Sequence, residues 1–181
     1  MTVPLVHLPL VQGRTVRRYM QRGEQDVLLA LVNHIAPKIM VEVGVNVGIT
    51  AKAVLSEVTT IERYIGIDVE PGYTFEIPAQ QIERPVFPGL LVKSHPRFEL
   101  VLRGNDLPTE ADFVFIDGDH GQRAVREDSI WATQVVRHGG MIVWHDYQNP
   151  TVEVTGVLDE LLAEGRALRH VAGTWLVFER R

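Results

Sequence analysis

The segment Ile39-Met40-Val41-Glu42-Val43-Gly44-Val45-Asn46-Val47-Gly48 is the starting point for working out the fold of this chain. Its first five residues form a short, mostly apolar run, which predicts a buried strand. The glycines that follow allow the backbone to turn tightly and to approach a ligand closely. Asn46 stands where another glycine is more usual, and Asn tolerates a left-handed backbone better than other non-glycine residues. A strand that leads through such a turn into a helix predicts a nucleotide-like ligand at the carboxyl end of the strand.

Apolar runs alternate with stretches of helical periodicity on both sides of this segment. Helices are expected at 23–36, 49–57, 121–137 and 152–164, the third of them stopped by Gly139-Gly140. Strands are expected at 39–43, 63–68, 98–102, 112–116, 141–144, 168–171 and 175–178. The alternation predicts a Rossmann-like α/β fold, a three-layer αβα sandwich around a mostly parallel seven-stranded sheet. The last two runs flank a tight turn and predict a C-terminal hairpin that adds an antiparallel strand.

The sequence shows no internal repeat and no low-complexity linker, so we expect one domain over residues 1–181. Residues 1–20 are expected to form an irregular N-terminal arm. Residues 70–96 hold five prolines, which a continuous helix cannot accommodate. We therefore expect a proline-rich loop region there, with at most a short helix at 79–83, and interpret the region as a lid or substrate-binding element.

Composition excludes several classes of function. The 181 residues carry a formal net charge of −5, so no overall basic field favours a nucleic acid as partner. There is no cysteine, which rules out disulfides, zinc–thiolate sites and cysteine nucleophiles. No run approaches the roughly 20 apolar residues of a membrane span. We expect a cytoplasmic protein without a membrane partner.

An acidic residue ends the second strand, about twenty residues after the glycine loop. The carboxylate of Asp68 can accept hydrogen bonds from both hydroxyls of a ribose. Nucleotide and S-adenosylmethionine sites share this geometry. The loop together with Asp68 therefore predicts a cofactor that contains a ribose.

Two further strands end in residues that can perform chemistry. His120 follows the fourth strand, and His145 and Asp146 follow the fifth. Because the carboxyl ends of neighbouring parallel strands meet at one edge of the sheet, these side chains are expected to converge. A histidine there could take a proton from an acceptor near neutral pH. We predict that His120, His145 and Asp146 are catalytic.

The stretches Phe115-Ile116-Asp117-Gly118-Asp119-His120 and Gly139-Gly140-Met141-Ile142-Val143-Trp144-His145-Asp146-Tyr147 complete the pattern. Taken in order, the chain resembles the class I S-adenosylmethionine-dependent methyltransferases over roughly residues 38–179. It is most similar to the small-molecule O-methyltransferase-like branch, whose members carry the IDGDH motif. The departure from the family pattern in the loop is Asn46.

The resemblance implies roles for individual residues. It places Glu42, Gly44 and Asn46 at the methionine end of the cofactor and Asn105 or Asp106 at the adenine. Asp117 would lie on the floor of the site, between cofactor and acceptor. The residues expected to bind the cofactor are Glu42, Gly44, Val45, Asn46, Gly48, Asp68, Val69, Asn105, Asp106 and Asp117.

Relatives of this branch often hold Mg²⁺ after the fourth and fifth strands, and the matching acids here are Asp117 and Asp146. His145 departs from that pattern, since Mg²⁺ prefers oxygen ligands.

The function implied is transfer of a methyl group from S-adenosylmethionine to a hydroxyl of a small molecule. One alternative is a catalytically silent module that binds S-adenosylmethionine or a partner, because the chain has no long insertion to close a pocket. In either case a homo-oligomer could complete the site. A second alternative is a nicotinamide-dependent Rossmann oxidoreductase. The terminal hairpin and the absence of a strict Gly-x-Gly-x-x-Gly motif count against it.

Overall fold

The computed structural model describes residues 23–77 and 82–181. The predicted N-terminal arm, residues 1–20, lies outside this part of the chain. The helices are α1 (Glu24–Ile35), α2 (Ile49–Glu57), α3 (Gln122–Val135) and α4 (Val154–Ala163). The strands are β1 (Ile39–Val43), β2 (Arg63–Asp68), β3 (Tyr73–Ile77), β4 (Ile82–Val86), β5 (Phe98–Leu102), β6 (Ala111–Ile116), β7 (Val136–Trp144), β8 (Arg169–His170) and β9 (Val177–Arg180).

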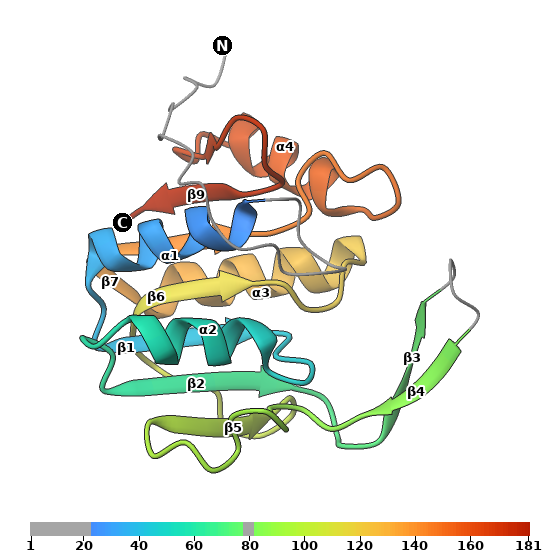
Figure 1. Cartoon of the computed structure of the whole chain (residues 1–181). Coiled ribbons are helices and arrows are strands. Elements are labelled where there is room, and N and C mark those ends of the chain that lie inside the picture. Colours follow the sequence, from blue (N-terminus) through green and yellow to red (C-terminus); the bar gives the residue numbers. More distant parts are fainter. Residues whose placement is uncertain (1–22, 78–81) are drawn as a thin grey trace.

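Seven of these strands form one twisted sheet in the order β5-β2-β1-β6-β7-β9-β8 (Figure 1). Five neighbouring strands are parallel to one another, namely β5, β2, β1, β6 and β7. The strand β9 runs antiparallel to both β7 and β8. The predicted mostly parallel sheet with a C-terminal antiparallel strand is therefore confirmed.

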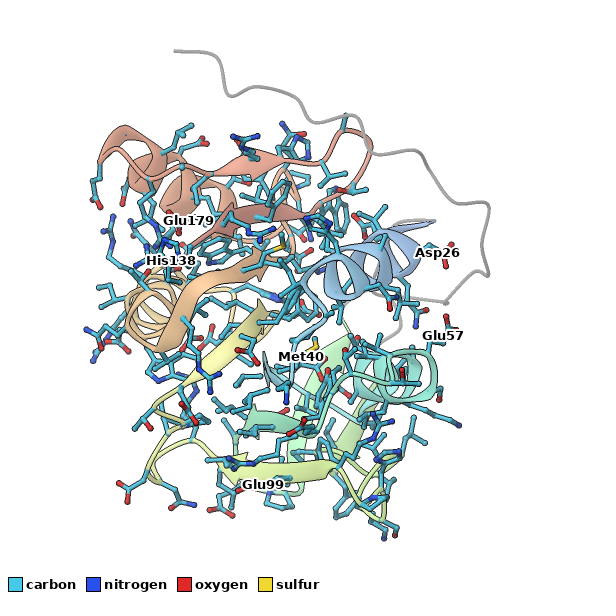
Figure 2. The ribbon with its side chains drawn as sticks, turned by 90° about the vertical axis from the view of Figure 1, so that its left-hand side faces the viewer. Asp26, Met40, Glu57, Glu99, His138 and Glu179 are labelled. Atoms are coloured by element: carbon cyan, nitrogen blue, oxygen red, sulfur yellow. The ribbon has the colours of Figure 1, made fainter. Side chains whose placement is uncertain are left out.

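Helices cover both faces of the sheet, as the alternation along β1 requires. Met40 points to the face that α1 and α2 cover, and Figure 2 shows it between the sheet and these helices. Val41 and Val43 point to the opposite face, where they join the core formed with α3 and α4. Successive strand residues face opposite sides of a sheet, so the apolar residues on both sides of β1 indicate burial on both faces. The three-layer αβα sandwich is confirmed.

The region 70–96 differs from the expectation of loops with at most a short helix. It contains an antiparallel hairpin of β3 and β4, which stands apart from the main sheet in Figure 1. The predicted helix at 79–83 is wrong at its end, because β4 begins at Ile82; residues 78–81 lie outside the described part. Pro85 belongs to β4, and proline fits a strand whose outer edge is unpaired. The prolines excluded a long helix, but they did not exclude strands.

The third helix also ends earlier than expected. It stops at Val135, and β7 begins at Val136, so Gly139 and Gly140 lie inside a strand. A Cβ atom on Gly140 would lie 2.5 Å from the carbonyl oxygen of Asp112 on β6. The pairing of β6 with β7 is irregular at this point. Gly140 therefore allows two strands to approach closely, where the sequence suggested a helix stop.

The parallel strands β1, β2, β6 and β7 all end at the same edge of the sheet (Figure 1). Ligands of open α/β sheets bind outside the carboxyl ends of such strands. Among the described residues, no helix has the length and apolar character needed to cross a membrane.

Candidate active site

A cavity of about 1290 Å³ lies at this carboxyl-terminal edge. The loops after β1, β2, β6 and β7 line it, together with the first turns of α1 and α3. It brings together most of the predicted site residues, namely Glu42, Gly44, Val45, Asn46, Asp68, Val69, Asp117, His120, His145 and Asp146. Gly48, Asn105 and Asp106 are not among its lining residues.

The glycine loop adopts the backbone conformation expected from its sequence. Gly44 has a φ of 87° and Asn46 a φ of 50°, so both lie in the left-handed region. A Cβ on Gly44 would lie 2.6 Å from the carbonyl carbon of Asp117 and would overlap the carbonyl oxygen as well. Gly44 is thus required both by its φ and by the close approach of the loop after β6.

Residues 87–92, which follow the β3–β4 hairpin, support the glycine loop from outside the cavity. The N–H of Gly89 donates to the carbonyl of Asn46, and the N–H of Leu91 donates to the carbonyl of Val47. A Cβ on Gly48 would lie 3.1 Å from the side chain of Val92. Residues 86–96, whose side chains the structure describes, do not line the cavity, and those at 87–92 support the glycine loop. A lid formed by the rest of region 70–96 stays a prediction.

Asp68 connects the second strand to the glycine loop. Its Oδ2 accepts a hydrogen bond from the N–H of Asn46 at 2.7 Å, and its Oδ1 accepts one from the N–H of Val69 at 2.8 Å. The carboxylate is buried yet lines the cavity. Two backbone donors fix its orientation, which prepares it for a polar ligand at the end of β2.

Glu42 lies under the glycine loop and is almost completely buried. Burial raises the pKa of the Glu42 carboxyl well above its usual range, although the hydrogen bond from the hydroxyl of Tyr64, 2.8 Å long, opposes this shift. Burial therefore favours the neutral form of this carboxyl more than in an exposed glutamate. A neutral carboxyl at this position can donate as well as accept a hydrogen bond.

The two residues that the resemblance places at the adenine do not line the main cavity. Asn105 and Asp106 are exposed and line a separate shallow depression beside β5. Arg103 lines the main cavity instead. Its guanidinium is held by both carboxylate oxygens of Asp128 on α3, each at 2.8 Å.

Asp117, His120, His145 and Asp146 form what we call the His–Asp cluster. The Nδ1 of His145 lies 3.1 Å from Oδ1 of Asp117 and 3.4 Å from Oδ2 of Asp146. The Nε2 of His120 lies 3.2 Å from the same oxygen of Asp146 and 3.6 Å from Oδ1 of Asp117. The two strand ends thus bring these side chains into contact, as the sequence predicted.

Surrounding carboxylates determine the charge of His145. Burial lowers the pKa of this imidazole, but Asp117, Asp146 and Glu24 outweigh burial and raise the pKa to about 12. Burial likewise raises the pKa of Asp117, but the charge of His145 and hydrogen bonds from His120 and His145 leave that pKa below its ordinary value. Near neutral pH the cluster therefore contains an imidazolium beside an ionised carboxylate.

His120 is the more accessible histidine, with 33% of its side chain exposed against 1% for His145. Hydrogen bonding to Asp117 raises the pKa of His120, burial opposes the shift, and the charge of Asp146 adds to it. Its Nε2 is buried and faces both carboxylates. Ligand atoms of Asp117, His120 and Asp146 all lie within 4.8 Å of one another, so a metal ion could bind among them.

Asp146 is held in an unusual backbone conformation. Its φ is 65°, in the left-handed region that non-glycine residues seldom occupy. The side-chain amide of Asn149 donates to its Oδ1 at 2.7 Å. Strain of this kind is concentrated at functional sites, where the surrounding structure maintains it.

Besides Arg103, two contacts of His145 were not predicted from the sequence. Glu24, the first residue of α1, contacts Nε2 of His145 at 3.2 Å and also accepts a hydrogen bond from the N–H of Trp175. Trp175 lines the cavity, and its ring lies 6.0 Å from that of His145. No local pattern identifies either residue, because both contacts depend on how α1 and the β8–β9 loop pack against β7.

Comparison with known proteins agrees with this fold. A family model described as a methyltransferase domain matches residues 41–147. The O-methyltransferase TomG from Streptomyces achromogenes, solved in complex with SAM, is similar in structure with a TM-score of 0.60 and 15% identity, over 88% of this chain and 80% of that chain. An O-methyltransferase from Bacillus cereus in complex with SAH gives a TM-score of 0.59 and 14% identity, over 95% and 84%. The SAH-bound methyltransferase PaMTH1 from Podospora anserina gives a TM-score of 0.61 at 14% identity, over 88% of this chain and 78% of that chain.

No curated protein matches the sequence. The matched family model includes the glycine loop, Asp68 and the His–Asp cluster. The fold and site define a methyltransferase of the Rossmann-like class. The chain belongs to the methyltransferase domain family, which confirms the resemblance drawn from its motifs.

Proposed function

We propose that this protein transfers a methyl group from S-adenosylmethionine to a hydroxyl of a small molecule. One observation carries the proposal: a single cavity contains both the glycine loop with Asp68 and the His–Asp cluster. A cofactor held at the first would present its methyl group toward the second. The structurally similar TomG and Bacillus cereus proteins are O-methyltransferases in complex with SAM or SAH, which supports this choice of cofactor and acceptor.

In this proposal the cofactor lies along the ends of β1 and β2. Gly44 and Asn46 approach its methionine part, and Glu42 lies beneath them. Asp68 would accept hydrogen bonds from the ribose hydroxyls, and Val69 and Arg103 would border the adenine. Arg103 takes this position because it lines the cavity, whereas Asn105 and Asp106 do not.

The reaction is a direct displacement at carbon. The acceptor oxygen forms a bond to the methyl group as the bond between that carbon and sulfur breaks, which leaves S-adenosylhomocysteine. The cofactor is already activated, so the protein supplies alignment and a group that takes the proton of the hydroxyl. We assign that proton to His120, because His145 is buried and already carries both of its ring protons.

Titration of the cofactor tests the proposal. S-adenosylmethionine and S-adenosylhomocysteine are expected to bind in the micromolar range by calorimetry, and Asp68→Ala is expected to weaken binding at least about tenfold, because a buried acceptor of two hydrogen bonds is lost. Glu70→Ala is the matched control, since Glu70 is an exposed acid near the same strand end that does not line the cavity. Binding of NAD instead would favour the oxidoreductase. Cofactor binding without methyl transfer to any hydroxylated acceptor would favour the silent module.

The dependence of turnover on pH tests the role of His120. The imidazole must be neutral to take a proton, so turnover should rise with pH and level off above the pKa of His120. The direction of its shift places this rise above the ordinary value of 6.5. We expect His120→Gln to lower turnover by about a hundredfold and to remove the rise. An unchanged pH profile in this variant would assign the proton to another group.

A divalent cation bound by Asp117, His120 and Asp146 is a second candidate for the same step. Such a cation would polarise the acceptor oxygen, and it would exclude the role of His120 as base. Two carboxylates and an imidazole suit Mn²⁺ better than Mg²⁺, which prefers oxygen ligands throughout.

We expect calorimetry to show tighter binding of Mn²⁺ than of Mg²⁺, and His120→Ala to abolish the difference. His138→Ala should leave both affinities unchanged, because His138 is exposed and does not line the cavity (Figure 2). Full turnover in the presence of EDTA would exclude a catalytic cation.

A further inference from the structure

Glu24 is buried in a position where an acid is usually exposed. It is the first residue of α1, and its side chain has no solvent exposure. Acids in the first turn of a helix usually face water, where they interact with the positive end of the helix dipole. A carboxylate almost never becomes fully buried unless it is paired. The burial of Glu24 therefore points to the groups that it contacts.

The two oxygens of Glu24 connect α1 to the end of β7 and to the loop between β8 and β9. One oxygen, Oε2, lies 3.2 Å from Nε2 of His145 at the end of β7. The other, Oε1, accepts a hydrogen bond from the N–H of Trp175 in the loop between β8 and β9. Both partners line the cavity, whereas Glu24 does not. Through these two contacts Glu24 can influence an acceptor bound in the cavity without lining the cavity itself.

His145 is held between carboxylates at both ring nitrogens. Its Nε2 faces Glu24, and its Nδ1 lies 3.1 Å from Oδ1 of Asp117. The ring cannot rotate without losing one of these contacts. Since Asp117 also faces His120, an ordered chain of contacts runs from α1 to the accessible histidine. Loss of Glu24 would release one end of this chain.

The contacts of Glu24 lie far from the part of the site that holds the ribose. Asp68 is on β2 and His145 follows β7, three strands away in the sheet order. Adjacent strands are about 4.8 Å apart, which separates these positions by roughly 14 Å. A change at Glu24 should therefore affect the acceptor half of the cavity and spare the cofactor half.

We propose that Glu24 is a positioning residue for methyl transfer, which fixes the ring of His145 and the loop of Trp175 along the acceptor side of the cavity. This inference rests on the proposed function. Glu24 touches neither cofactor nor acceptor, and its effect reaches the reaction through His145 and Trp175.

The test compares Glu24→Gln and Glu24→Ala with the unaltered protein and with Asp26→Ala. Asp26 is an acid in the same first turn that does not line the cavity. Three quantities are measured: the affinity for S-adenosylhomocysteine, turnover with catechol as a hydroxylated probe, and exchange of the His145 ring N–H protons by NMR. We expect Glu24→Gln to lower turnover about tenfold and Glu24→Ala about a hundredfold, as for other residues that orient a functional group through a second side chain. Affinity for S-adenosylhomocysteine should stay within about twofold.

The NMR signal does not depend on which acceptor the protein uses. The ring protons of His145 should exchange slowly in the unaltered protein and in Asp26→Ala, and rapidly in Glu24→Ala. Slow exchange in Glu24→Ala, unchanged turnover in both Glu24 variants, or an equal loss of affinity and turnover would overturn the proposal. If Glu24→Ala does not fold, the same criteria apply to Glu24→Gln, which keeps the shape of the side chain. Failure of the unaltered protein to bind S-adenosylhomocysteine is a separate outcome that would overturn the proposed function itself.

Discussion

Gly44→Ala is expected to abolish cofactor binding and to lower the free energy of unfolding by about 3 kcal/mol or more. The added Cβ would lie 2.6 Å from the carbonyl carbon of Asp117. Because this contact is with the backbone of Asp117, it cannot be relieved by rotating a side chain. The φ of 87° adds a cost of its own for any residue with a side chain. Chemical denaturation and calorimetry with S-adenosylhomocysteine measure the two effects.

Gly139→Ala separates the two causes. Gly139 has the same φ of 87°, but a Cβ there would meet no atom within 4 Å. The free energy of unfolding should fall by only about 1–2 kcal/mol in this variant, which is the cost of the left-handed backbone. Its cofactor affinity should be unchanged. If Gly44→Ala were as stable as Gly139→Ala and bound the cofactor normally, the close approach of the two loops would have no role in binding.

Asp117→Ala is expected to reduce turnover by about a thousandfold and stability by about 3 kcal/mol. The carboxylate contacts both histidines of the His–Asp cluster, so its removal leaves the buried charge of His145 with fewer partners. The accessible His120 loses an acceptor that orients it. Methyl-transfer assays and denaturant titrations measure these two losses.

Asp112→Ala is the matched control, because Asp112 lies at the opposite end of the same strand, β6. Its Oδ2 accepts hydrogen bonds from the N–H groups of Lys38 and Ile39, each at 2.9 Å. Stability should fall in this variant while turnover per folded molecule stays unchanged. Equal losses of turnover in both variants would show that general loosening of β6 causes the effect.

Local sequence patterns predicted most of the fold because the central strands β1, β2 and β6 are buried on both faces. The run Ile39–Val43 is apolar except for Glu42 and can be recognised in the sequence, and β1 has the predicted bounds. The β3–β4 hairpin could not be predicted, because prolines in a sequence usually indicate loops. The start of β7 differs from the prediction because Gly139 and Gly140 resemble a helix stop, and the role of Gly140 depends on Asp112 of a neighbouring strand.

The candidate site was predictable where it depends on strand ends. Neighbouring parallel strands bring Asp117 and His120 close to His145 and Asp146 without any further information. Glu24 was not predictable, since it lies 121 residues from His145 and reaches it only through the packing of α1. The charge of His145 was not predictable either, because it depends on carboxylates from three elements. The sequence left open which histidine takes the proton, whereas in the structure carboxylates raise the pKa of His145 to about 12.

The hydrogen bond between Glu24 and Trp175 joins residues 151 positions apart. A ribosome adds roughly 5–20 residues per second, so many seconds separate the synthesis of these two residues. Most of the parallel sheet can pair before Trp175 leaves the ribosome, but the acceptor side of the cavity cannot be completed. Nascent chains that stop before the last hairpin should therefore hold cofactor-binding elements without a finished acceptor side, and catalytic competence should be among the last properties acquired during synthesis.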